Sequence, residues 1–141
     1  MSKEERRIRV LVIDDDLDLA RARADFLEEL GCDVTAVSTA AEATRLLSSS
    51  EPIDLVMTDI NLAGNAYDQS GLALARLSKE MRPATPVVAY SSYFKEAHLK
   101  FEQYPEVNRW FVKGSLGAAQ MEGAMGEVVA LARAMRSLPG E

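Results

Sequence analysis

Short apolar runs alternate along the chain with longer stretches in which apolar residues recur three or four positions apart. The short runs are bounded by polar residues and are too brief for helices, so they predict buried strands. They occupy 8–13, 34–37, the interior of 54–61, 87–90 and 109–112. The periodic stretches predict helices over 17–30, 39–47, 73–81, 94–103, where the pattern is mixed, and 121–135. This alternation predicts an α/β fold in three layers, in which five helices cover a five-stranded parallel sheet joined by right-handed crossovers.

Two of the predicted helices carry clear boundary signals. Gly31 follows the first helical stretch and predicts its end, because glycine readily adopts the left-handed conformation found after a helix C-cap. Thr39 and Glu42 have the spacing of a capping box, which predicts the start of the second helix.

Length and charge limit the function classes. A chain of 141 residues suits one domain over 1–141, and 22 acidic against 16 basic residues give a formal charge of −6. This excess of acid argues against a nucleic-acid surface, and no stretch has the length of a membrane span. Cys32 is the single cysteine, which excludes an internal disulfide and a Cys-rich zinc site. We therefore expect a cytoplasmic protein, and any metal should be a hard cation bound through oxygen.

Polar residues stand where four of the predicted strands end. Asp14 and Asp15 follow the first strand and Asp59 ends the third, while Ser91 and Lys113 follow the fourth and fifth. The carboxyl ends of parallel strands share one edge of the sheet, so we expect these residues to converge there. Three neighbouring carboxylates repel one another, so at least one should resist ionisation unless a cation is bound. Mg²⁺ suits this oxygen-rich set best.

The chemistry of this group indicates a phosphoryl site. The serine hydroxyl and the lysine amine would supply hydrogen-bond donors for an anion held against the metal. Asp59 could then attack phosphorus, because phosphoryl transfer asks a protein mainly for positioning and charge neutralisation.

These residues, in this order at these strand ends, resemble the receiver domain of bacterial two-component response regulators, including chemotaxis regulators, over about residues 8–136. The resemblance implies a flavodoxin-like sheet of order 2-1-3-4-5. It also implies that Asp59 accepts a phosphoryl group from a phosphohistidine on a sensor histidine kinase or phosphotransfer protein. Beyond its own phosphorylation and dephosphorylation, such a protein is not an enzyme. Its remaining partner would be a downstream protein or an output domain absent from this chain.

The resemblance also assigns roles to individual residues. Asp15 and Asp59 would ligate Mg²⁺ by carboxylate, Asn61 by its backbone carbonyl and Asp14 through water. Ser91 would hydrogen-bond the phosphoryl group and Lys113 would pair with it. Trp110 would occupy the aromatic switch position, repacking inward when Ser91 is drawn toward the phosphate, and this movement would alter a partner-binding face.

Two features depart from the receiver pattern. Gly114 stands where receivers usually have a proline joined by a cis peptide, and a cis bond without proline costs roughly 2.5–4 kcal/mol. We therefore expect a trans bond after Lys113 and a reshaped loop. Ala63 replaces the common proline of the loop after Asp59, and the segment 59–71 is longer than usual.

Three other interpretations remain open. The acids 14–16 could serve only as the solvated N-terminus of a helix. Asp14 and Asp16 also permit the D-x-D arrangement of haloacid-dehalogenase-like phosphohydrolases, although the acid pair that those enzymes need after the lysine is lacking between 114 and 136. A pseudo-receiver that keeps the fold and signals by partner binding alone is the third interpretation.

Overall fold

The five predicted strands form one parallel sheet. In a computed structural model of the protein, the described residues are 7–60, 62, 70–91, 104–112 and 118–136. The strands are β1 (Arg9–Ile13), β2 (Asp33–Val37), β3 (Leu55–Asp59), β4 (Val87–Ser91) and β5 (Arg109–Val112). Their order is β2-β1-β3-β4-β5 and every pairing is parallel, which confirms the predicted flavodoxin-like sheet.

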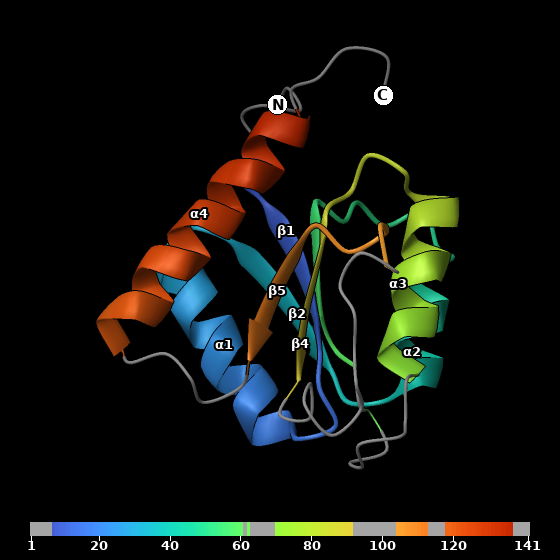
Figure 1. Ribbon diagram of the computed structural model, residues 1–141, viewed down its shortest axis with the longest axis horizontal. Helices are drawn as coiled ribbons and strands as arrows, with labels where there is room; N and C mark the ends of the chain where they lie inside the picture. Colours follow the sequence, from blue (N-terminus) through green and yellow to red (C-terminus); the bar gives the residue numbers. More distant parts are fainter. Residues whose placement is uncertain (1–6, 61, 63–69, 92–103, 113–117, 137–141) are drawn as a thin grey trace.

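Helices cover both faces of this sheet. The part of the chain that the structure describes contains four of them, α1 (Leu17–Glu29), α2 (Ala40–Leu47), α3 (Ser70–Met81) and α4 (Ala118–Arg136). Helices α1 and α4 lie on one face and α2 and α3 on the other (Figure 1). The helix predicted over 94–103 lies outside the described residues.

Side-chain alternation along the strands divides the core into two layers. In β1, Val10 and Val12 belong to the cluster that contains residues of α1 and α4, whereas Leu11 and Ile13 belong to the cluster with α2 and α3. All of β3 is buried, as expected of a central parallel strand covered on both faces. Layers on both sides therefore hold the end of β3 in place.

The helix boundaries follow the predicted signals. Gly31 follows Leu30, the C-cap residue of α1, and has a φ of +90°. Thr39 Oγ1 accepts a hydrogen bond from the Glu42 amide at 3.2 Å. Strand β4 runs one residue past its predicted end, because Ser91 pairs with Val112. Cys32 is fully buried, as expected of a small apolar side chain. Among the described helices there is none with the length and hydropathy to cross a membrane.

Candidate functional site

The ends of β1 and β3 bring three carboxylates together. Ile13 pairs with Thr58, so the next residues, Asp14 and Asp59, lie side by side at the carboxyl edge of the sheet. One carboxylate oxygen each from Asp14, Asp15 and Asp59 lies within 4.8 Å of the others. Asp14 is 0% and Asp59 3% exposed, whereas Asp15 faces solvent. The predicted convergence of these three acids is therefore correct.

The three acids do not ionise independently. The pKa of Asp15 is raised from 3.8 to about 6, first by partial burial of its carboxyl and then by hydrogen bonds with Asp59 and Asp14 and by their negative charges. The cluster thus holds a proton at a pH where an isolated aspartate is ionised, as predicted for carboxylates without a bound cation.

This donor set fits a small hard cation. The gathered groups are all carboxylates, which are the ligands that Mg²⁺ prefers. After burial and hydrogen bonding, the negative charges of Asp59 and Asp14 add to the raised pKa of Asp15, so the cluster carries an excess of negative charge. A divalent cation would relieve that excess. The cluster can accordingly hold a metal ion.

Gly71, which the sequence did not single out, is where α3 contacts the end of β3, the strand that carries Asp59. Its amide donates to the Ile60 carbonyl at 2.9 Å. A Cβ at this position would overlap the carbonyl oxygen of Asp59 and lie 2.6 Å from Ile60 Cα. Only glycine therefore lets the first turn of α3 approach the backbone that carries the Asp59 carboxylate.

Arg23 and Tyr90 also border the cluster and were missed. Arg23 Nη1 lies 3.1 Å from Asp14 Oδ2, and its guanidinium carbon lies 4.3 Å from the centroid of the Tyr90 ring. The Tyr90 hydroxyl donates to the Ile13 carbonyl at 3.0 Å. Burial raises the pKa of Tyr90 well above its ordinary value, and the charge of Arg23 opposes part of that rise. Arg23 follows Ala20 by three positions and so lies beside the apolar stripe of α1, but this spacing does not show how closely it approaches Asp14.

The remaining predicted residues are only partly described. Ser91 ends β4, so its backbone lies at the same edge of the sheet as Asp59. The Ser91 side chain lies outside the described residues, as do Asn61 and Lys113. The predictions for Ala63, Gly114 and the bond before Gly114 fall outside as well.

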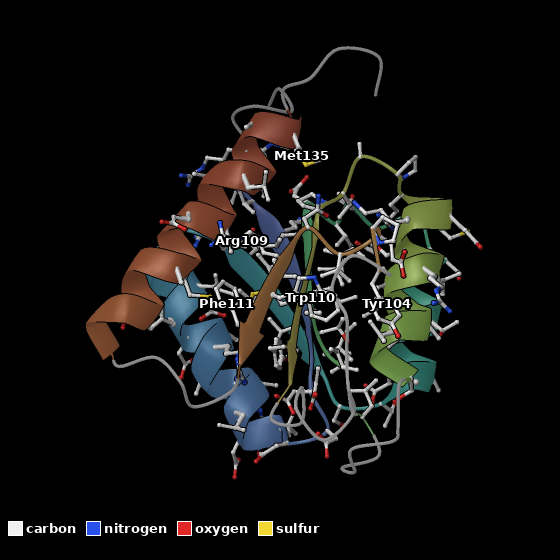
Figure 2. All side chains as sticks on the ribbon, in the orientation of Figure 1. Tyr104, Arg109, Trp110, Phe111 and Met135 are labelled. Atoms are coloured by element: carbon white, nitrogen blue, oxygen red, sulfur yellow. The ribbon has the colours of Figure 1, made fainter. Side chains whose placement is uncertain are left out.

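Trp110 lies in β5 and points toward α3, whereas its neighbour Phe111 points toward α1 and α4 (Figure 2). The Trp110 ring is half-buried, and its centroid lies 6.0 Å from that of the Tyr104 ring. Trp110 and Tyr104 thus belong to the core layer of α2 and α3, whereas Phe111 belongs to the layer of α1 and α4.

Asp16 keeps its carboxylate outside the cluster, although its backbone amide donates to Asp14 Oδ1 at 3.0 Å. Its carboxylate accepts hydrogen bonds from the amides of Asp18 and Leu19 and caps α1. The helix-terminus interpretation is therefore correct for Asp16, and it does not account for Asp14, which is buried beside Asp59. A D-x-D hydrolase site would need the second acid for chemistry, whereas here it serves the helix.

Comparison with known proteins agrees with the fold. Residues 10–112 match the sequence profile of the response regulator receiver domain. A solved response regulator receiver protein from Sinorhizobium medicae WSM419 is 26% identical with a TM-score of 0.72, covering 91% of this chain and 98% of its own. A sensor protein from Polaromonas sp. JS666 is also 26% identical with a TM-score of 0.70, covering 90% and 99%.

Sensor protein TorS of Escherichia coli (strain K12) is a curated protein to which the chain is similar. It is 28% identical over 93 residues, which are 66% of this chain. The match spans only 10% of the length of TorS. The similarity therefore concerns one segment of that much longer protein.

Proposed function

The chain belongs to the response regulator receiver domain family, and from this we propose that it is a phosphorelay receiver that accepts a phosphoryl group on Asp59. Domains of this family are typically non-enzymatic signalling modules. The donor would be a phosphohistidine on a sensor histidine kinase or phosphotransfer protein, and residues 1–141 would act as one cytoplasmic domain. The observation that carries the proposal is the position of Asp59, almost buried at the end of β3 beside Asp14 and Asp15.

The proposed transfer uses Asp59 as the nucleophile. A carboxylate oxygen of Asp59 attacks phosphorus, a new P–O bond forms, and the P–N bond to the donor imidazole breaks. The imidazole nitrogen keeps the bonding electron pair and takes up a proton. The product is an acyl phosphate on Asp59.

The neighbouring residues would position and neutralise the reacting groups. Asp15 and Asp59 would hold Mg²⁺ by carboxylate, Asn61 by its carbonyl and Asp14 through water. When bound, the ion supplies the charge neutralisation that phosphoryl transfer requires. Ser91 would donate to a phosphoryl oxygen and Lys113 would pair with the phosphoryl charge.

Phosphorylation would then change a partner-binding surface. Ser91 would move toward the phosphoryl group, and Trp110 would repack inward. The half-buried state of Trp110 supports this proposal, because the ring still has exposed surface to lose. Its fluorescence should therefore respond to beryllofluoride with Mg²⁺, and a flat signal in protein that binds the mimic would contradict the movement.

Labelling with acetyl phosphate and MgCl₂ tests the assignment. Intact-mass analysis should show one added phosphoryl group on the wild type. EDTA added before the acetyl phosphate should prevent this addition. Asp59→Asn should abolish the addition. Asp25→Asn, a matched change at an exposed acid of α1, should leave it intact.

Other outcomes would select the competing functions. No addition from acetyl phosphate or from any phosphohistidine donor would favour a pseudo-receiver that signals by binding alone. Sustained release of phosphate that depends on Asp14 and Asp16 and survives Asp59→Asn would favour a phosphohydrolase.

A further inference from the structure

Arg23 places a fixed positive charge against the acidic cluster. The arginine lies on α1, its side chain is 15% exposed, and its Nη1 is 3.1 Å from Oδ2 of the fully buried Asp14. On another side, the guanidinium carbon lies 4.3 Å from the centroid of the Tyr90 ring, which is itself 2% exposed. A carboxylate and an aromatic face therefore hold the guanidinium in a place from which water is largely excluded.

The location of this charge affects any cation bound by the cluster. Asp14 contributes one of the three gathered carboxylates, and Arg23 already pairs with one of its oxygens. Interactions between partly buried charges are weakly screened by salt. A divalent cation at the cluster would share Asp14 with Arg23 and would be repelled by the guanidinium.

We propose that Arg23 is a positioning residue that sets the affinity of the cluster for divalent cations by acting as the permanent counter-ion of Asp14. In the metal-free protein, it offsets part of the mutual repulsion of the acids. In the metal-bound protein, it weakens binding relative to what the three carboxylates alone would give. The inference rests on the proposed function only in that a divalent cation binds at this cluster.

Titration calorimetry with MgCl₂, at constant pH and ionic strength, measures the predicted effect. Arg23→Met keeps an unbranched side chain against Tyr90 and removes the charge, and it should bind Mg²⁺ about tenfold more tightly. Arg23→Lys retains a positive charge and should stay within about twofold of the wild type. Arg21→Met removes the same charge from an exposed position of α1 and should also leave the affinity unchanged.

A second readout is the melting temperature in EDTA and in MgCl₂. Arg23→Met should melt at a lower temperature than the wild type in EDTA and gain more from MgCl₂. If this variant does not fold, Arg23→Gln keeps a hydrogen-bond donor near Asp14 without the charge, and it too should bind Mg²⁺ more tightly than the wild type.

The outcomes separate this inference from the proposed function. If the wild type binds Mg²⁺ and the folded uncharged variant binds it with equal or weaker affinity, only the role of Arg23 is overturned. Tighter binding in Arg23→Lys or Arg21→Met as well would also overturn it, because the effect would not then depend on this charge. Absence of Mg²⁺ binding in the wild type and every variant would overturn both the metal dependence and this inference.

Discussion

Arg136, in the last turn of α4, lies with its Nη1 3.5 Å from Oδ2 of Asp54, the residue before β3. Both side chains are below 10% exposed, at 6% and 8%. The same Asp54 oxygen accepts a hydrogen bond from the Arg9 amide at 2.9 Å. The pair therefore joins the C-terminal helix to two neighbouring strands at the end of the sheet opposite the acidic cluster.

Asp54→Asn should destabilise the protein by about 3 kcal/mol, because it leaves the buried charge of Arg136 without this counter-charge. Urea unfolding followed by circular dichroism measures the change. The matched control is Glu127→Gln, which removes the exposed ion pair between Arg109 and Glu127 and should cost below about 1 kcal/mol. Equal effects of the two substitutions would contradict the structural role of the buried pair.

Gly71→Ala should be strongly destabilising, by about 3 kcal/mol or more, because the added Cβ overlaps the Asp59 carbonyl oxygen. The backbone of β3 or α3 must shift to relieve the overlap, so labelling of Asp59 should also fall. Gly123→Ala in α4 is the control, since a Cβ there meets nothing within 4 Å. That change should stabilise the helix by about 0.5–1 kcal/mol. Thermal unfolding of both variants provides the comparison, and a Gly71→Ala protein as stable as the wild type would refute the close approach.

Arg82 caps the C-terminal end of α2 and should therefore contribute to the stability of the fold. Its guanidinium donates to the carbonyls of Leu47 at 3.1 Å, Leu46 at 3.3 Å and Ser49 at 2.8 Å. Arg82→Met should therefore cost about 1–3 kcal/mol, because partly buried carbonyls at a helix end lose their donors. Arg45→Met removes an exposed arginine from the last turn of the same helix and should cost no more than about 0.5 kcal/mol. Urea unfolding distinguishes the two, and a similar cost for both would contradict the capping role.

The sequence was sufficient to predict the sheet and the acidic cluster, because both follow from local patterns. Apolar runs define the strands, and parallel strands must share an edge, which brings Asp14, Asp15 and Asp59 together. Gly71 and Arg23 were missed for a different reason. Their roles depend on how closely α3 and α1 approach the strands, and spacing along the chain does not contain that distance.

The pair of Arg136 and Asp54 could not be predicted from the sequence either, because 82 positions separate the two residues. Neither residue stands out in the sequence, because an arginine at the end of a helix and an acid before a strand are usually solvated. Only the position of α4 across the sheet makes them a buried pair.

The raised pKa of Asp15 predicts how stability depends on pH in metal-free protein. Between 3.8, the ordinary value, and about 6, the value in the fold, the folded protein retains a proton that the unfolded chain has released. Folding is therefore favoured below this window, and the contribution of Asp15 to stability falls as the pH rises through it. In EDTA, the free energy of unfolding of the wild type should decline from about pH 4 to 6 relative to that of Asp15→Asn, which cannot ionise at this position. A constant difference between the two proteins would contradict the raised pKa of Asp15 in the folded protein. Adding MgCl₂ should restore more stability to the wild type above pH 6 than below it, because the cation replaces the bound proton as the partner of the carboxylates.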